Sequence, residues 1–340
     1  MKKIFVIISN ATAGIETYET NLIKLLEQRK QKIYLISEKK KLSKKKNRLI
    51  INYYCNVIWE PIKVFSHLLK IKNTHNYTKI SFIINNPLIL VIYFFILKFF
   101  FKNKEIFLIK HSHITNFKFS QIIIGFVSSI LSNFINKVIF VSNFTSVWWF
   151  KYFSLYRFCN FAVIHNFIYP PKKRVIQKKK YVFNIGFVGR LDKEKNFTRF
   201  IEIAQYFKNN NRFKFFVFGN NSPKYFIKNN INFFGWREKV HIYHNIQLLI
   251  VTSPIENCPF SVLEAKSYGI PTLTISDGGI KEIIMNNKDG IILPQTASLR
   301  LIKSKIIYIK NHYPFYSKNC FQYSKNFTST RFKKKILKLF

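Results

Sequence analysis

Two basic side chains in one short loop could bind a diphosphate group. Arg190 and Lys195 follow an apolar run at residues 184–188, and a helical pattern begins near Asn196, a residue type that often caps a helix. Cations beside the N-terminus of a helix form a favourable site for phosphate groups. Because lysine and arginine are abundant throughout this chain, the loop considered alone is more typical of an ordinary solvated surface.

Two glutamates eight positions apart form the second candidate group. Glu256 follows the apolar run at residues 248–251, and Glu264 lies about one and a half turns into a helix that Pro259 would begin. A carboxylate among apolar neighbours needs a partner, which the hydroxyls of a sugar or a ribose would supply. A capping glutamate followed by a solvent-facing glutamate explains this segment equally well when it is taken alone.

A pair of glycines and the cysteines add little chemistry by themselves. Asp277 precedes Gly278 and Gly279, which would let the backbone approach a ligand or form a tight turn. The cysteines are dispersed and include no Cys-x-x-Cys pair, which argues against a zinc site and against a disulfide scaffold. They are Cys55, Cys159, Cys258 and Cys320.

The composition is that of a folded and strongly basic protein. The chain has 340 residues, enough for two domains, and 48% of them are hydrophobic. Its 56 lysines and arginines against 15 aspartates and glutamates give a formal net charge of +41. Such a charge favours polyanions such as nucleic acid or an anionic membrane surface. An AT-rich genome would also produce this abundance of Lys, Asn, Ile, Phe and Tyr, so the charge alone does not identify a partner.

Short apolar runs alternate with longer helical patterns along the chain. This alternation predicts an α/β protein with doubly wound parallel sheets, covered by helices on both faces. Strands are expected at residues 4–8, 33–36, 80–84, 106–109, 138–141, 184–188, 214–218, 231–234, 248–251 and 272–275, and helices at 16–29, 88–101, 121–136, 197–207 and 260–268. Ligands of such sheets lie at the carboxyl ends of the strands, and a cleft between two such domains suits a reaction of two substrates.

Two further segments bear on the organisation of the chain. Residues 169–180 combine two prolines with a dense basic run and are the best candidate for a linker. Residues 80–101 are apolar enough to suggest a membrane span, but the Asn-Asn-Pro sequence at 85–87 divides them. The longer piece falls short of the ~20 residues that a bilayer requires. The apolar run after Met1 is too short for a signal peptide, so a cytoplasmic protein is expected.

In this order and spacing, the segments resemble the C-terminal domain of glycosyltransferase family 4, a group of retaining enzymes among the group 1 glycosyl transferases. The family pattern has a strand followed by Gly-Arg-Leu and Glu-Lys-Asn, then two glutamates eight positions apart, an alanine and Gly-x-Pro. The matching residues are Gly189, Arg190, Leu191, Glu194, Lys195, Asn196, Glu256, Glu264, Ala265, Gly269 and Pro271. The resemblance implies a GT-B fold, in which two doubly wound Rossmann-like domains face a central cleft.

The resemblance also implies a role for each matching residue. Arg190 and Lys195 would bind the donor diphosphate and stabilise negative charge on the departing nucleotide. Glu264 would hold the ribose hydroxyls, and Glu256 with the backbone of the next four residues would orient the transferred sugar. Those four are Asn257, Cys258, Pro259 and Phe260. The family usually has a Phe-Gly or similar small pair there, so the identity of the sugar does not carry over.

The first half of the chain matches the family more loosely. Gly14 lies where the family has a glycine-rich loop against the donor phosphates, but Ala13 replaces the second glycine. Two histidines follow the expected strand at residues 106–109. His111 is the expected residue beside the transferred sugar, and His113 is the alternative. Without the resemblance, two such histidines would more often be structural.

The resemblance implies four parts of the chain. They are an acceptor-binding domain at residues 1–168, a linker at 169–180, a nucleotide-sugar-binding domain at 181–310, and a segment at 311–340 that crosses back to the first domain. The activity it implies is retaining transfer of a sugar from a donor, preferably UDP-linked, to a glycan or glycolipid acceptor. Synthesis of lipopolysaccharide or another cell-surface polysaccharide would use such a reaction. The Asp-x-Asp metal motif of the other glycosyltransferase fold is absent, so no metal and no cofactor are expected.

The expected partners are the nucleotide sugar, the acceptor and an anionic membrane surface, where the cytoplasmic protein would bind peripherally. Nucleic acid is not expected as a partner. Two alternatives remain open at this point. One is a basic nucleic-acid-binding protein, indicated by the charge alone, although its basic residues are spread along the chain instead of forming one stripe. The other is a phosphorylase or an epimerase with the same fold.

Overall fold

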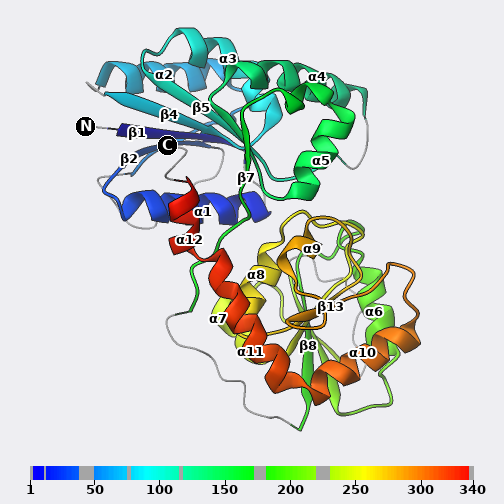
Figure 1. Cartoon of the computed structure of the whole chain (residues 1–340). Helices are drawn as coiled ribbons and strands as arrows, with labels where there is room; N and C mark the ends of the chain where they lie inside the picture. Colours follow the sequence, from blue (N-terminus) through cyan, green and yellow to red (C-terminus); the bar gives the residue numbers. More distant parts are fainter. Residues whose placement is uncertain are drawn as a thin grey trace. The chain divides into compact units, whose positions relative to one another are not determined.

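A computed structural model describes residues 3–10, 13–37, 50–74, 78–114, 118–171, 181–219 and 230–336. Contacts between residues divide the chain into two compact units. The first unit comprises Met1–Asn166 and Phe332–Phe340, and the second comprises Phe167–Arg331 (Figure 1). Most of the expected linker, residues 172–180, lies outside the described residues.

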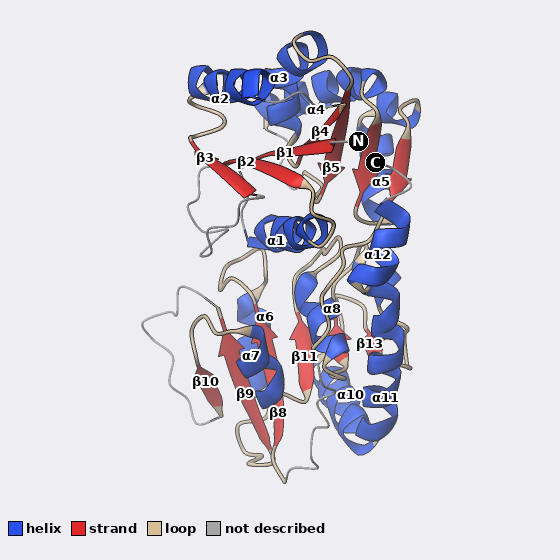
Figure 2. Cartoon of the chain, turned by 90° about the vertical axis from the view of Figure 1, so that its left-hand side faces the viewer, coloured by secondary structure: helices blue, strands red, loops and turns tan. Residues whose placement is uncertain are grey.

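The first unit contains a parallel sheet of seven strands in the order β3-β2-β1-β4-β5-β6-β7. The strands are β1 (Lys3–Ser9), β2 (Lys32–Ser37), β3 (Ile50–Tyr54), β4 (Lys79–Ile84), β5 (Lys104–Lys110), β6 (Lys137–Phe140) and β7 (Phe161–Val163). The helices are α1 (Ala13–Glu27), α2 (Pro61–Thr74), α3 (Pro87–Phe99), α4 (Phe119–Leu131), α5 (Asn143–Tyr152) and, from Phe332 onward, α12 (Ser329–Ile336). In both views α1 lies on one face of the sheet, and α2, α3 and α4 lie on the other (Figures 1 and 2).

The strands and helices expected in the first half are confirmed to within a few residues, but four further elements were missed. Strand β7 has only three residues, which is too short for a detectable pattern. Helix α5 distributes its aromatic residues around its circumference, so it shows no single apolar stripe. Strand β3 is half-buried and so lacks a continuous buried run, and the stripe of buried residues on helix α2 was overlooked.

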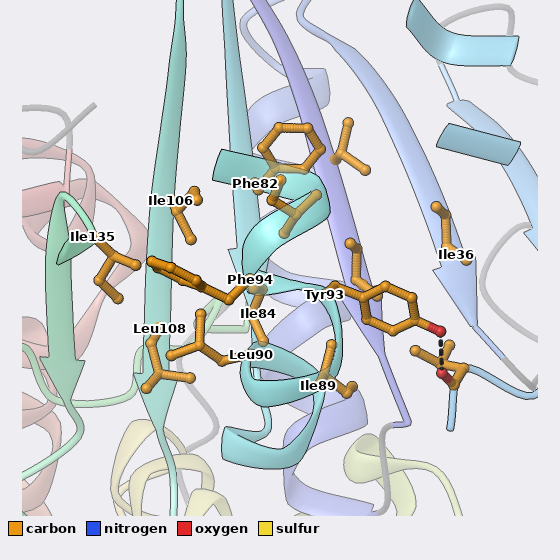
Figure 3. Packing of buried hydrophobic residues seen from close by; sticks show 14 of the residues in the cluster. Ile36, Phe82, Ile84, Ile89, Leu90, Tyr93, Phe94, Ile106, Leu108 and Ile135 are labelled. Atoms are coloured by element: carbon orange, nitrogen blue, oxygen red, sulfur yellow. Dashed lines mark hydrogen bonds between the residues drawn. The ribbon is translucent and has the colours of Figure 1, made fainter. Parts of the chain in front are cut away.

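The core of the first unit forms where α3 packs on the sheet. Tyr93 and Phe94 lie among buried residues of β4 and β5, and the Tyr93 hydroxyl donates a hydrogen bond to the Val57 carbonyl at 2.6 Å (Figure 3). Asn86 caps α3 by accepting the N–H of Leu88 at 2.9 Å. The Asn-Asn-Pro sequence therefore separates a strand from a helix, as expected. No helix within the described ranges is long and apolar enough to cross a membrane.

The Lys110 side chain is buried in this core without a polar partner among the described residues. The side chain of Lys110, at the end of β5, is 2% exposed, and its Nζ has no hydrogen-bond acceptor among the described residues. The amine lies 3.4 Å from the ring centroid of Trp149 and 4.5 Å from that of Tyr156. Burial lowers the pKa of Lys110 well below its usual value.

Replacing Lys110 by methionine is expected to raise the free energy of unfolding by about 1–3 kcal/mol at pH 7, because it removes a buried polar group without leaving a cavity. Because burial lowers the pKa of Lys110, the unfolded chain keeps a proton at this lysine at pH values where the folded chain has already released it. Wild-type stability should therefore gain up to about 1.4 kcal/mol per pH unit as the pH rises from the lowered pKa toward the ordinary lysine value of about 10.4, and the variant should lose that gain. Thermal unfolding across this pH range measures both effects, with the exposed Lys151→Met as the control. A less stable K110M would contradict the account.

The second unit contains a parallel sheet of six strands in the order β10-β9-β8-β11-β12-β13 (Figure 2). The strands are β8 (Phe183–Val188), β9 (Phe213–Phe218), β10 (Ile231–Phe233), β11 (Leu248–Val251), β12 (Thr272–Thr274) and β13 (Gly290–Ile292). The helices are α6 (Phe197–Gln205), α7 (Lys239–Asn245), α8 (Phe260–Ser267), α9 (Ile280–Ile283), α10 (Leu299–Asn311) and α11 (Tyr313–Ser324). Every strand and helix expected in this half is present.

Two local expectations are refined by the structure. Asn196 is at the N-cap of α6, but it has a left-handed backbone (φ 45°) and its side chain makes no capping hydrogen bond, so the expected cap is wrong in its mechanism. At the end of the chain, α11 packs on α8 within the second unit. Phe332 of α12 belongs to the first unit, where its ring centroid lies 6.1 Å from that of Tyr18.

Candidate active site

The order of strands in the second unit brings two loops beside each other. The chain adds β9 and β10 on one side of β8 and then β11 on the other, so the order reverses between β8 and β11. Ligands of open parallel sheets bind at the carboxyl ends of the strands where the order reverses. Lys195 lies in the loop after β8, and Glu256 lies in the loop after β11. The fold alone therefore places both residues at the expected binding position.

Lys195 and Glu256 form an ion pair at this point. Lys195 Nζ donates to Glu256 Oε1 at 2.6 Å, and Ser253 Oγ donates to the same oxygen at 2.6 Å. The Glu256 side chain is 11% exposed and that of Lys195 is 30% exposed. An ammonium group has three N–H donors. Lys195 can thus hold Glu256 and still offer donors to a second anion.

Backbone hydrogen bonds fix both residues. The N–H of Lys195 donates to Asp192 Oδ1 at 2.9 Å, and its carbonyl accepts from Thr252 Oγ1 at 2.9 Å. The N–H of Glu256 donates to the Asp277 carbonyl at 3.0 Å, and its carbonyl accepts from the N–H of Ile280 at 3.1 Å. Since neither residue depends on its side-chain pairing for position, the pair is preorganised for a ligand.

The segment with two glycines, Asp277–Gly279, holds the backbone of Glu256 in place. Gly278 has φ 93°, a left-handed conformation that favours glycine, and its N–H donates to Asp277 Oδ1 at 2.7 Å. Lys281 Nζ pairs with the same carboxylate oxygen at 2.7 Å. The hydrogen bond from Lys281, with that from the Gly278 backbone, lowers the pKa of Asp277. The segment that was weak evidence for a ligand contact therefore helps to shape the loop around Glu256.

Arg190 makes its contacts within its own loop. It pairs with Asp192 at 3.1 Å and with Glu194, and its side chain is 54% exposed. The hydrogen bond with Glu194 is the main cause of a raised pKa at Arg190. The guanidinium is fully charged at neutral pH in any case. Arg190 is available at the surface of the same loop as Lys195, although no hydrogen bond joins it to the Lys195–Glu256 pair in the described structure.

Glu264 is held by helix α7, which the sequence had not revealed. Lys239 Nζ pairs with Glu264 Oε1 at 2.5 Å, and the Tyr243 hydroxyl donates to Glu264 Oε2 at 3.0 Å. The Glu264 side chain is 12% exposed. Burial raises the pKa of Tyr243 well above its usual value, and the charge on Glu264 raises it further. The hydroxyl therefore stays protonated and can keep orienting the carboxylate.

The four residues after Glu256 lead into the first turn of α8. Cys258 is buried and forms no disulfide within the described structure, and Pro259 is the N-cap residue of the helix. Proline has no N–H, and the Pro259 carbonyl already accepts from the N–H of Leu263. Within this segment, Asn257 and Phe260 are the residues with half-buried side chains and a backbone N–H.

Sequence reasoning also missed a glycine at the end of β9. A Cβ on Gly219 would lie 1.9 Å from the carbonyl oxygen of Gly189, so only glycine allows the backbone to pass. The N–H of Gly189 donates to the Phe218 carbonyl at 3.0 Å, which joins the two strand ends. A glycine directly after an aromatic strand was the available signal.

The remaining two predicted residues, Gly14 and His111, lie in the first unit. Gly14 is exposed in the first turn of α1, where a Cβ would meet no atom within 4 Å. His111 follows β5, and its ring centroid is 4.7 Å from that of Tyr18. Burial lowers the pKa of His111 to about 3, and its Nε2 has no partner in the described structure. The imidazole is therefore neutral at pH 7.

A hollow of about 310 Å³ adjoins the candidate site in the second unit. It is lined by Asn196, Thr198, Arg199, Glu202, Thr252, Pro254, Ile275 and Gln295. None of the residues predicted to bind the donor is in this lining. Arg199 is already paired there with Glu202 at 2.7 Å and donates to the Ala297 carbonyl at 2.6 Å.

Comparison with known proteins gives a family match for part of the chain. Residues 170–326 match the model of the family described as glycosyl transferases group 1. The chain is also 27% identical, over 170 residues, to UDP-Gal:alpha-D-GlcNAc-diphosphoundecaprenol alpha-1,3-galactosyltransferase of Escherichia coli. That match covers 44% of this chain and 42% of the relative. The chain therefore matches about two fifths of the relative's length.

Solved structures show the same architecture over the whole chain. Sucrose-phosphate synthase of Thermosynechococcus elongatus has a TM-score of 0.81 at 12% identity, with 99% of this chain and 98% of that chain covered. Anabaena HepE in complex with UDP has a TM-score of 0.77 at 14% identity, with 99% of both chains covered. At these identities the similarity establishes the fold. The chain therefore has the GT-B fold of two Rossmann-like domains, and its residues 170–326 are similar to the glycosyl transferases group 1.

Proposed function

We propose that the protein is a retaining glycosyltransferase of family 4, which transfers a hexose from a nucleotide sugar to a glycan or glycolipid acceptor. The observation that carries this proposal is the Lys195–Glu256 pair, which joins the two loops at the point of the sheet where the strand order reverses. A cation and a carboxylate fixed together at that point suit a substrate with both a diphosphate and a sugar.

The candidate site residues of the second unit have separate roles in this proposal. Lys195 and Arg190 bind the diphosphate, and Lys195 stabilises the negative charge that grows on it as the sugar departs. Glu256 accepts hydrogen bonds from the sugar hydroxyls. Glu264 accepts from the ribose hydroxyls, in a position fixed by Tyr243 and Lys239. The N–H groups of Asn257 and Phe260 are further candidates for contact with the sugar.

The proposed chemistry needs no enzyme nucleophile. The acceptor hydroxyl forms the new glycosidic bond on the face from which the diphosphate leaves, the bond from the anomeric carbon to the phosphate oxygen breaks, and a donor phosphate oxygen takes the hydroxyl proton. Glu256 is poorly suited as a nucleophile because one of its oxygens already accepts hydrogen bonds from Lys195 and Ser253. His111, neutral at pH 7, would orient the sugar from the first unit together with the backbone at Gly14 near the phosphates.

UDP-galactose is the first donor to test, and a lipid-diphosphate-linked sugar is the first acceptor. The name of the Escherichia coli relative contains both a UDP-galactose donor and a GlcNAc-diphosphoundecaprenol acceptor. We extend the proposal to synthesis of lipopolysaccharide or another cell-surface polysaccharide, at the inner face of the cytoplasmic membrane. No metal and no cofactor take part in the proposed reaction.

A transfer assay with a short-chain GlcNAc-diphospholipid acceptor tests the proposal. Purified protein should move the sugar of one UDP-hexose to the acceptor, and NMR of the product should show retention of the anomeric configuration. Interconversion of free nucleotide sugars without an acceptor would favour an epimerase. A salt-sensitive shift of RNA in a gel, without binding of any nucleotide sugar, would favour a nucleic-acid-binding protein. Either result would overturn the proposal.

Replacing Tyr243 by phenylalanine is expected to raise the KM for the donor about threefold to tenfold and to change kcat less than twofold. The variant loses a hydrogen bond to a carboxylate, which contributes about 1.5–3 kcal/mol at most, and Lys239 still holds the other oxygen. Donor-dependent kinetics measure the effect. Tyr268→Phe is the matched control, because the Tyr268 ring packs on Tyr243 and its hydroxyl does not bond to Glu264 in the described contacts. An unchanged KM for Y243F would contradict a positioning role.

A further inference from the structure

Helices α3 and α4 of the first unit leave an apolar surface uncovered. The two helices pack against each other and are neighbours in both views (Figures 1 and 2). The uncovered side chains are all phenylalanine or isoleucine, and we call them the α3–α4 face. They are Phe95, Phe99, Phe119, Ile122, Ile123, Phe126, Ile130 and Phe134, and each is classed as exposed. On α4 their spacing follows one side of the helix.

The two stripes are joined through Phe134, which follows α4. Its ring centroid lies 6.4 Å from that of Phe94 on α3, and Lys98 of α3 donates to the Phe134 carbonyl at 2.7 Å. Phe95 and Phe99 stack with centroids 6.1 Å apart. The exposed residues of α3 therefore continue into the end of the α4 stripe. Contiguous apolar surface of this kind marks an interaction site.

The charge around this face is of one sign. Lys98 lies on α3, Lys102 follows it, and Lys118 is the N-cap residue of α4. Residues 61–166 contain eleven lysines and one arginine but a single acidic residue, Glu105. Glu105 is itself paired with Lys3 at 3.0 Å and Lys79 at 2.5 Å, and its side chain is 12% exposed. No free carboxylate in the described part of this region would repel an anionic surface.

We propose that the α3–α4 face docks the first unit on an anionic lipid bilayer, with its phenylalanine and isoleucine side chains among the acyl chains and the nearby lysines at the lipid phosphates. Apolar side chains with lysines beside them fit the membrane interface. The inference deepens the proposed function and rests on it, since such docking would bring the enzyme to a lipid-linked acceptor.

Flotation of the full chain with lipid vesicles tests the docking. Wild-type protein should float with vesicles of phosphatidylcholine and about one third phosphatidylglycerol, and should float much less with phosphatidylcholine alone. Raising the salt from 0.1 to 0.5 M should weaken the binding because the lysine contribution is screened. The double variant Phe119→Glu/Phe126→Glu should lower the partition coefficient at least tenfold, because each glutamate would enter an anionic apolar interface.

A matched control distinguishes binding through the α3–α4 face from nonspecific binding of exposed apolar residues to vesicles. Phe315 of α11 is 53% exposed, against 54% for Phe126, so Phe315→Glu makes the same change at an equally exposed site of the second unit. Its flotation should equal that of the wild type. A second readout uses Phe126→Cys labelled with a polarity-sensitive dye, since all four native cysteines are buried. The dye emission should shift to the blue with anionic vesicles.

Several outcomes would overturn the docking proposal. They are wild-type protein that does not float, a double variant that floats as well as the wild type, or a dye that does not respond. So would an oligomer that the double variant disperses without any vesicle binding, which would make the face a contact between proteins. Binding of nucleotide sugars to the second unit is measured on the same variants. Lost docking with retained donor binding leaves the proposed function standing, and the reverse result overturns the function alone.

Discussion

Replacing Lys195 by alanine is expected to lower kcat for sugar transfer by about 100- to 1,000-fold, which is the usual cost of removing one preorganised group that stabilises developing charge. The ammonium is fixed by its own backbone hydrogen bonds and by Glu256. In the proposed donor complex it would thus meet the diphosphate without reorganising as the sugar leaves. The KM for the donor should rise less than kcat falls, because the charge on the diphosphate is greatest in the transition state.

Two companion variants make the result specific. Lys193→Ala removes an exposed lysine two positions away in the same loop and should retain wild-type kinetics. Lys195→Arg keeps the charge and should recover part of the lost rate. Steady-state kinetics with the donor that binds best would measure all three. An alanine variant within threefold of the wild type would remove Lys195 from the proposed chemistry.

Replacing Lys266 by alanine is expected to destabilise the second unit by about 3–5 kcal/mol, because it leaves a carboxylate buried without its counter-ion. Lys266 Nζ donates to Asp289 Oδ2 at 2.6 Å and to the Ile283 carbonyl at 2.5 Å. Lys266 and Asp289 are each 1% exposed. Burial lowers the pKa of Lys266 and raises that of Asp289, so desolvation outweighs their mutual attraction. The pair connects α8, which carries Glu264, to the loop before β13.

The double variant Lys266→Met/Asp289→Asn separates pairing from packing. Methionine keeps most of the lysine volume, and the asparagine oxygen can still accept the N–H of Met285, which now bonds to Asp289 Oδ1 at 2.9 Å. Its unfolding free energy should lie within about 1.5 kcal/mol of the wild type. Denaturant unfolding of the three proteins measures the difference. A single alanine variant as stable as the wild type would show that Asp289 finds another partner.

Local patterns predicted the fold well where the elements are long or bordered by glycine and proline. The apolar strand at Ile80–Ile84 and the helix after Pro87 follow from the Asn-Asn-Pro break alone. Helix α7 escaped detection because its seven residues are mostly polar or aromatic and lack a repeating stripe. Strand β13 has three residues and is identified by pairing with β12, which is a contact between distant parts of the chain.

The residues of the candidate site could likewise be predicted only in part. The types and order of Lys195, Glu256 and Glu264 could be read from the sequence, since they follow strands. Their partners could not, because Ser253 reaches Glu256 only through the conformation of their shared loop, and Tyr243 reaches Glu264 through the packing of α7 on α8. The unusual burial of Lys110 was invisible for the same reason.

The most direct test of the central claim is calorimetric titration of the protein with a panel of nucleotide sugars, repeated with Glu264→Ala and Glu238→Ala. Glu238 is an exposed carboxylate at the N-cap of α7, next to Lys239, and is the matched control. We predict that at least one UDP-hexose binds the wild type and the control alike, and that Glu264→Ala weakens it at least tenfold, or about 1.4 kcal/mol. If no nucleotide sugar binds the wild type, or if Glu264→Ala binds as tightly, the donor site proposed here is contradicted.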